Sequence, residues 1–438
     1  MCAMAEGVAE QRDAVVAGLQ RDLNCLIDAD RQIRKSALGK LEKRLLGKDR
    51  PPPGVFDAVV VAIMPTLVKA LGDSVEKCRE LAVALVSGLL GSTSVVDPLL
   101  PALLPAVAAR VGVSPSPEPG EEIRLRLVQV VEGPVLSKAS PEALDRMLDD
   151  VAPAVACSLE DPYPEARKSA ARACAALAGR ANAGALRKHS GRLLRSVVAC
   201  LAHRHTAVRT AALAAADALV MCGAPAAADV AEVVAPAMRA CAFDRTQSVR
   251  AAAYEALARW LQGAPREEGP GLAPGLSHAQ LLLPPLLLGV TEEAEENRAR
   301  ALALVERVGE ASLAAAGGGA GGDEAAGGVE RMSIDGDGGG ASAAGAGPEL
   351  PHPWRGRPGA GARAVARALC KQLLPAVLRD LREWTAGVRS AGARMLHTLL
   401  VLAESEAEAH LGALLPALCA AVADDDAETA GRGGGGAQ

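Results

Sequence analysis

Aromatic residues are the scarcest component of this sequence. Its 438 residues include three Trp, two Tyr and two Phe, so aromatics make up 2% of the chain although half of the residues are hydrophobic. Alanine and leucine supply most of the apolar surface, and both are strong helix formers. The aromatic and β-branched residues that favour strands are few apart from valine. The composition therefore predicts an all-α protein.

A net positive charge is also missing, since the formal net charge is −5. Proteins that bind nucleic acid or anionic membranes through long-range electrostatics carry a basic surface, so we expect neither as a partner. The longest apolar run that we identify, Pro98 to Ala109, is too short to span a bilayer and holds three prolines. We expect no transmembrane segment.

Paired cysteines and secretion signals are absent from the sequence. The ten cysteines form no C-x-x-C pair and lie mostly among apolar neighbours, as small buried hydrophobes do. The first residues lack a basic stretch followed by an apolar one, and no N-x-S/T acceptor occurs. These features predict a reducing compartment, with the cytoplasm as the expected location.

Two short signals recur along the chain. The first is an apolar pair followed by proline, and the second is a small or apolar residue followed by arginine. The interval from proline to arginine is fourteen residues in five places: Pro65 to Arg79, Pro153 to Arg167, Pro236 to Arg250, Pro284 to Arg298 and Pro375 to Arg389. Further arginines of the series are Arg34, Arg124 and Arg209, and successive members from Arg34 to Arg298 are 41 to 48 residues apart. This is the period of a helical-hairpin repeat.

Each half of a repeat shows helical periodicity. Around Arg209, Leu194, Val198 and Leu201 form an apolar stripe before the turn, and Ala212 and Leu219 form one after it. A single hairpin cannot bury such a stripe alone, so neighbouring hairpins must stack. The sequence predicts an α-solenoid of about eight to nine hairpins, with proline bending the first helix of each.

Carboxylates precede the arginines in or near the turns. We expect Asp73, Asp161, Asp244 and Asp380 to cap the N–H groups at the start of the next helix. Each arginine is expected to pair with the aspartate of an adjacent repeat, in partly exposed pairs worth about 0 to 1 kcal/mol. We therefore expect a ladder that sets stacking register, made of Asp73, Arg79, Arg124, Asp161, Arg167, Arg209, Asp244, Arg250, Arg298, Asp380, Trp384 and Arg389.

The Asp-x-x-x-x-Val-Arg pattern after a proline-containing helix resembles the HEAT repeat. Repeats 1–7 are predicted over residues 10–313, and repeat 8 with the first helix of repeat 9 over 363–425. Glycine and alanine dominate residues 314–362, which predicts a disordered linker, and residues 426–438 are a predicted disordered tail. Ser333 in the linker is either a phosphorylation site or an unmodified linker residue.

A Cys-His cluster and a tryptophan are the candidate sites of chemistry or partner contact in the sequence. Cys200, His203 and His205 are three plausible zinc ligands, but His residues two apart do not share a helix face, so we interpret the cluster as a polar turn without metal. No nucleophile elbow, papain-like cysteine or H-E-x-x-H occurs, and we expect neither enzymatic activity nor a cofactor. Trp384 is either a core residue or a partner contact.

Several segments, among them Glu121 to Gly133, Cys157 to Ala178 and Cys370 to Glu404, are similar to the N-terminal half of the HEAT-repeat dynein axonemal assembly factors. That resemblance implies a cytoplasmic, non-enzymatic scaffold for preassembly of axonemal dynein arms in cells with motile cilia or flagella. The implied partners are axonemal dynein chains, including intermediate chains, together with chaperones and other assembly factors.

A general protein-binding HEAT adaptor is the alternative function, of the tubulin-binding, importin-like or phosphatase-scaffold type. Tubulin binders are expected to show aromatic and lysine residues at the early turns, where this chain has sequences such as GDSVEK. Importin-like adaptors are expected to show recurrent Trp-x-x-x-Asn, which this chain lacks. Both observations favour the assembly scaffold.

Overall fold

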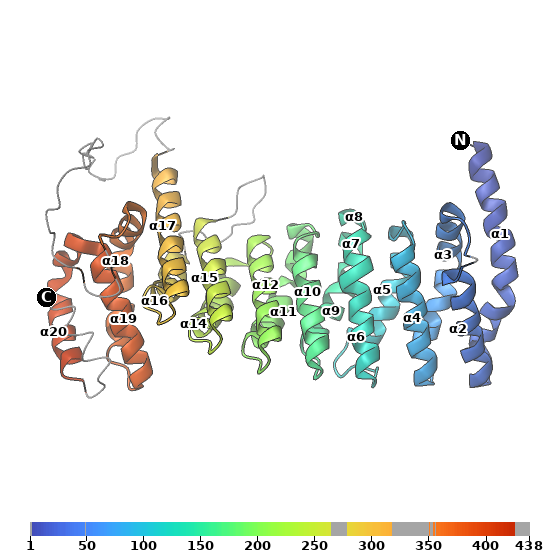
Figure 1. The fold of residues 1–438 in the computed structure, drawn as a ribbon, viewed down its shortest axis with the longest axis horizontal. Coiled ribbons are helices and arrows are strands. Elements are labelled where there is room, and N and C mark those ends of the chain that lie inside the picture. Colours follow the sequence, from blue (N-terminus) through green and yellow to red (C-terminus); the bar gives the residue numbers. More distant parts are fainter. Residues whose placement is uncertain are drawn as a thin grey trace. The chain divides into compact units, whose positions relative to one another are not determined.

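The computed structural model describes residues 2–48, 50–263, 278–317, 350, 354 and 356–424, with 2–6 and 315–317 described as backbone only. No strand occurs in these residues, which confirms the predicted all-α class. Ser333 and most of the predicted linker lie outside the described residues. The helices of Figure 1 are α1 (Cys2–Asn24), α2 (Arg31–Leu46), α3 (Pro53–Leu67), α4 (Glu76–Ser92), α5 (Leu100–Val111), α6 (Glu121–Val130), α7 (Leu136–Lys138), α8 (Pro141–Arg146), α9 (Leu148–Leu159), α10 (Pro164–Ala178), α11 (Ala183–Leu201), α12 (Thr206–Met221), α13 (Ala227–Asp229), α14 (Ala235–Cys241), α15 (Gln247–Gln262), α16 (Ala279–Gly289), α17 (Glu295–Gly317), α18 (Ala360–Asp380), α19 (Ala386–Ala403) and α20 (Leu411–Val422).

The described helices pair into eight hairpins followed by α20, as the repeat spacing predicted. They form two compact units, the first made of Met1–Ala252 with Gly263–Pro274 and the second of Ala253–Gln262 with Gly275–Gln438. Several of the first helices contain an interior proline, and α3 changes after Pro65 into a 3-10 turn over Val68–Gly72. Pro236 instead lies in the first turn of α14, directly after a π-helical turn over Val230–Val234.

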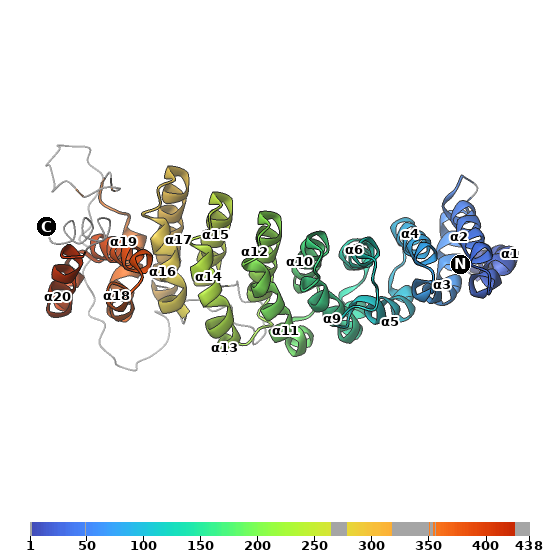
Figure 2. The same cartoon turned by 90° about the horizontal axis from the view of Figure 1, so that it is seen from below.

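The first unit consists of two layers of helices, which are seen from below in Figure 2. One layer is formed by α1, α3, α5, α9 and α11, each packed against the next, and the other by α2, α4, α6, α10 and α12. The turn that joins the two helices of a hairpin lies beside the turns of the neighbouring hairpins. Side chains in successive turns can therefore bind one another.

Alanine allows the second layer to pack closely. Ala170 and Ala173 of α10 and Ala212 and Ala215 of α12 are completely buried, and these two helices lie side by side. Small side chains let helix axes approach while larger leucines fill the space between the layers. The abundance of alanine thus has its reason in helix packing.

The segment Pro53–Gly72 corrects one expectation from the sequence. It is longer than the Pro98 to Ala109 run and, by length and composition, is apolar enough to cross a membrane. In the structure 56% of its 18-residue apolar window is buried, and α3 packs against α1 and α5. These properties are those of a solenoid core helix.

The second unit stacks its last hairpin in a different way. α17 packs along α18, and α16 contacts both α18 and α19. A Cβ atom at Gly309 of α17 would overlap the carbonyl oxygen of Gly361 in α18, so the two backbones cross at glycines. The carboxylate of Glu306 accepts hydrogen bonds from the N–H groups of Gly361 and Ala362 at 2.6 and 2.9 Å. This contact caps α18 from α17.

The structure corrects the predicted linker boundaries on both sides. α17 continues to Gly317, beyond residue 313, and α18 begins at Ala360, before residue 363. Composition alone placed these residues in the linker, whereas the Glu306 cap favours a helix from Ala360 onward. Arg357 also binds Glu404, with Nε and Nη2 at 2.7 and 2.9 Å from the carboxylate oxygens.

Candidate functional site

The recurring arginine has the same place in every hairpin: it is the fourth residue of the second helix. In six of the eight hairpins Nη1 donates to the carbonyl oxygens six and five residues earlier, for example from Arg209 to His203 and Arg204 at 2.9 and 3.2 Å. Arg250 makes the first of these contacts, to Asp244 at 2.7 Å. A cation near a helix N-terminus opposes the helix dipole, so these carbonyl contacts are needed to hold it there.

The remaining donors of the arginine bind the turn of the next repeat. In the first unit Nε and Nη2 reach both oxygens of one carboxylate at 2.6 Å and 2.8–3.0 Å, in the pairs Arg34 with Asp73, Arg79 with Glu118, Arg124 with Asp161 and Arg209 with Asp244. Arg389 binds Asp424 in the same way in the second unit. Such a planar fork explains arginine in place of lysine.

In the first unit the acidic partner lies six residues before the arginine of its own repeat. Its second function is local, because one carboxylate oxygen accepts the N–H of the residue two positions later, as Asp73 does from Val75 at 2.7 Å and Asp244 from Thr246 at 2.8 Å. That residue immediately precedes the helix. The carboxylate thus fixes the turn and links it to the preceding repeat.

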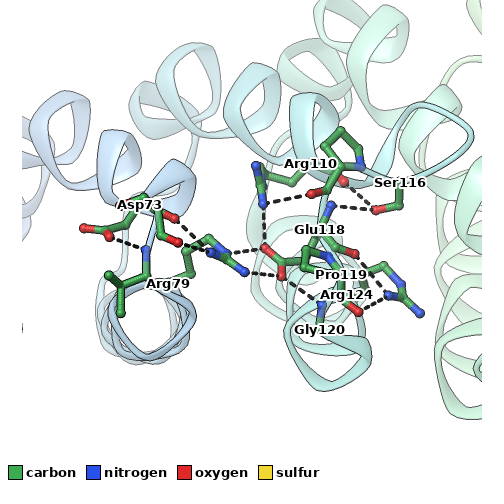
Figure 3. Close-up of polar contacts among 11 residues, drawn as sticks. Asp73, Arg79, Arg110, Ser116, Glu118, Pro119, Gly120 and Arg124 are labelled. Carbon is green, nitrogen blue, oxygen red and sulfur yellow. Dashed lines mark hydrogen bonds and ion pairs between the residues drawn. The ribbon is translucent and has the colours of Figure 1, made fainter.

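Glu118 is the most highly connected carboxylate of this set and is completely buried (Figure 3). Arg79 binds both of its oxygens at 2.6 and 2.9 Å, Arg110 donates to Oε2 at 2.7 Å, and the N–H of Gly120 donates to Oε1 at 3.0 Å. The Oγ of Ser116 accepts the N–H of Glu118 at 3.2 Å. Two arginines and one backbone N–H therefore converge on one acidic side chain, and Ser116 holds the backbone of the same residue.

These pairs are more deeply buried than the sequence suggested. The side chains of Arg124 and Asp161 are 9% and 7% exposed, where partly exposed pairs were expected. The next hairpin in the stack covers each turn. This burial cannot be inferred from the sequence of a single repeat. Breaking a buried pair leaves an uncompensated charge and costs about 3–5 kcal/mol, in contrast to about 0–1 kcal/mol for a surface pair.

The pairing also shifts proton affinities. Burial by itself raises the pKa of Glu118, but hydrogen bonds from Arg79 and Arg110 outweigh it and hold that pKa below its ordinary value. The pKa of Asp73 is lowered for the same reasons, with Arg34 and the N–H of Val75 overcoming burial. The ladder carboxylates at these two places remain ionised at neutral pH.

Not every predicted ladder residue has the predicted role. Asp380 is the last residue of α18 and is buried, but it lies nine residues before Arg389; the six-residue position belongs to Glu383. Arg298 donates to the carbonyls of Glu292 and Glu293 and has no carboxylate partner among the described residues. The different docking of α18 takes the following turn away from Arg298.

The sequence interpretation missed Glu118 and Asp424. The five extra residues before Glu118 concealed its equivalence to the aspartates, and Asp424 was treated only as part of the predicted repeat 9. A search for acids six residues before each recurring arginine would have identified Glu118. The same search would not have identified Asp424, because no arginine lies six residues after it.

Trp384 lies at the surface and not in the core. It is 92% exposed in the turn between α18 and α19, so the core interpretation was wrong. Its carbonyl oxygen accepts a hydrogen bond from Arg389 at 2.8 Å, which ties the turn to the helix while the indole faces solvent. The partner contact stays a prediction.

The ladder is interrupted between Arg167 and His203. His203 lies six residues before Arg209, where the neighbouring repeats carry an acid, and its Nδ1 accepts the N–H of His205 at 3.1 Å as a carboxylate would. Arg167 turns its Nε and Nη2 to the carbonyls of Asp161 and Glu160. Burial lowers the pKa of His203, and Arg167 and other nearby cations lower it further. The histidine thus keeps the turn but supplies no negative charge.

No group of three or more His, Cys, Asp or Glu side chains in the described part of the chain is arranged to hold a metal ion. Cys200 donates its Sγ–H to the carbonyl of Leu159 at 3.1 Å. His203 and His205 lie in the turn between α11 and α12, with ring centroids 5.3 Å apart.

Comparison with known proteins identifies the family. A family profile described as "Dynein axonemal assembly factor 5-like, TPR repeats" matches residues 25–313, which is more than half of the chain. The chain belongs to the dynein axonemal assembly factor 5 family. A second profile, described as "Dynein axonemal assembly factor 5, HEAT-repeat domain", matches residues 350–432. The resemblance drawn from the sequence is confirmed.

Two dynein axonemal assembly factor 5 proteins show the extent of this relationship. The human protein is 31% identical over 372 residues, covering 83% of this chain and 40% of that protein. The mouse protein is 29% identical over 441 residues, covering 98% and 48%. The chain thus spans about half the length of the curated relatives it matches.

Two solved structures are similar to this chain at lower identity. A crystal structure of computationally designed armadillo repeat proteins for modular peptide recognition has a TM-score of 0.43 at 20% identity and covers 55% of this chain and 98% of that one. Kap121p bound to Ste12p has a TM-score of 0.47 at 14% identity and covers 95% and 36%.

Proposed function

We propose that this chain acts in the cytoplasm as a non-enzymatic scaffold for the preassembly of axonemal dynein arms. The observation that carries the proposal is the family match over residues 25–313, together with relatives named dynein axonemal assembly factor 5. The stacked hairpins support a role in binding, because they extend a continuous protein surface from repeat to repeat. The proposed partners are axonemal dynein chains, including intermediate chains, with chaperones and other assembly factors.

The structure supports binding over catalysis through the state of its charged residues. Four ladder arginines of the first unit and their carboxylates are engaged in pairs that hold repeats together, as between Arg124 and Asp161. Their ionised groups are saturated by each other and by backbone groups. A scaffold requires this rigidity, since a partner is recognised by the spacing of several repeats at once.

The test is disruption of the gene in the ciliated or flagellated cell that carries it. We expect axoneme cross-sections without dynein arms and reduced dynein heavy chain in the cytoplasm, both restored by the wild-type gene. Affinity purification from a cytoplasmic extract should recover dynein chains before they enter the axoneme. Intact arms with normal heavy-chain levels would overturn the proposal.

A further inference from the structure

A groove lies beside the turn between α11 and α12, which contains His203, and we call it the repeat-5 groove. It differs in volume and charge from an equivalent groove elsewhere in the first unit. Its apolar wall comes from α11 and α14 and includes Val198, Leu201 and Ala237. Its polar edge comes from the turns after these two helices. The volume is about 600 Å³, within the range of pockets that hold ligands.

The equivalent groove lies at the first turn and has a volume of about 230 Å³. Ile27 lies seven residues before Arg34, where the repeat-5 groove has Ala202 seven residues before Arg209. Lys69 likewise lies four residues before Asp73, and Ala240 lies four before Asp244. Replacement of long side chains by alanine therefore accounts for the larger cavity.

The charges of the two grooves also differ. In the first groove Arg34 and Lys69 are balanced by Asp28 and Asp73. In the repeat-5 groove the three cations Arg204, Arg209 and Arg245 meet one acid, Asp244, and Arg209 already binds that acid through both oxygens. The position of Asp28 is taken by His203.

Among the residues that the structure describes, Arg204 and Arg245 have no carboxylate partner. Arg204 donates Nε to the Nε2 of His205 at 3.1 Å, and Arg245 donates Nη2 to the carbonyl of Arg204 at 2.8 Å. These acceptors are uncharged, so they orient the two guanidinium groups without neutralising them. Both arginines are exposed at the edge of an apolar cavity.

We propose that the repeat-5 groove binds an acidic segment of a partner protein, which seats a large apolar side chain against α11 and α14 and places carboxylates at Arg204 and Arg245. The apolar wall supplies burial energy, and the arginine forks supply the preference for a carboxylate. This inference goes beyond the proposed function, because it names the chemistry of a bound segment and holds whichever protein carries it.

The test is fluorescence anisotropy with the whole chain and a labelled peptide, Gly-Asp-Glu-Leu-Asp-Glu-Gly. We expect saturable binding that weakens with salt, and a loss of affinity of about tenfold for Arg204→Glu or Arg245→Glu. Lys69→Glu reverses a cation of the smaller groove and should leave the affinity unchanged. Circular dichroism checks that each variant is folded.

Two further comparisons separate a groove from general attraction between charges. Ala202→Ile copies Ile27 of the smaller groove, and replacement of the peptide leucine by alanine removes the apolar group; each should lower affinity severalfold. The proposal is overturned if Arg204→Glu and Arg245→Glu bind as the wild type does, if Lys69→Glu weakens binding equally, or if neither apolar change has an effect. Equal competition by a single-stranded oligonucleotide would overturn it in favour of a nucleic-acid surface.

Discussion

His203 stands opposite Arg167 at the place where, two repeats earlier, Glu118 binds Arg79 through both carboxylate oxygens. The two contacts differ in one residue type, an acid replaced by histidine. Arg167 accordingly donates to carbonyl groups of the turn that precedes its own helix.

Restoring the acid at this place is expected to add a pair to the ladder. His203→Asp should raise the free energy of unfolding by about 1 kcal/mol, because the new carboxylate can accept from both Arg167 and the N–H of residue 205. Chemical denaturation measures the change. In a double-mutant cycle with Arg167→Gln the gain should disappear, and a gain that persists would show that Arg167 is not the partner.

Removing an existing pair should have the opposite effect. Arg209→Ala leaves Asp244 buried without its cation and is expected to cost about 3 kcal/mol, whereas His203→Ala removes one neutral acceptor and costs less than about 1 kcal/mol. Thermal melting of both variants ranks them. Equal melting midpoints would refute the ranking.

Glu118 should make the stability of the first unit depend on pH. Its folded pKa lies below the ordinary 4.5, so its contribution is fully present above that value and is lost as pH falls through the folded pKa. Between neutral and acid pH, the free energy of unfolding should decline less steeply in Glu118→Gln than in the wild type. At neutral pH this variant should be about 3 kcal/mol less stable than the wild type. Glu121→Gln, at an exposed position, is the control, and an unchanged slope in Glu118→Gln would contradict the prediction.

The contact of α17 with α18 gives a prediction for the second unit. Gly309→Ala should destabilise it by about 2 kcal/mol, because the new methyl group overlaps the backbone of Gly361. Gly387→Ala has open space and should leave stability unchanged or slightly higher. Hydrogen exchange in α17 and α18 reports the difference, and equal protection in the two variants would show that the helices can separate at no cost.

Local patterns in the sequence were sufficient for much of this fold. The fourteen-residue interval from Pro65 to Arg79, repeated elsewhere, fixed the position of the turns, and the apolar stripes predicted two helices per repeat. Burial of Arg124 and Asp161 depends on the next hairpin, and the crossing at Gly309 and Gly361 depends on contacts distant in sequence. These two features and the solvent exposure of Trp384 could be found only from the structure.

The joint between the fourth and fifth hairpins, where α10 packs closely against α12 through alanines, should respond to acid differently from its neighbours. In the neighbouring joints acid neutralises the carboxylate that binds the turn arginine, whereas Arg167 has no carboxylate partner among the described residues and its joint is packed by Ala170, Ala173, Ala212 and Ala215. Carboxylate contacts that remain in this joint, such as those from Asp149 to Lys188 and from Glu160 to Ser196, lie outside the turn ladder. Falling pH therefore weakens the flanking joints first. The fourth and fifth hairpins should persist together as the last folded remnant of the first unit.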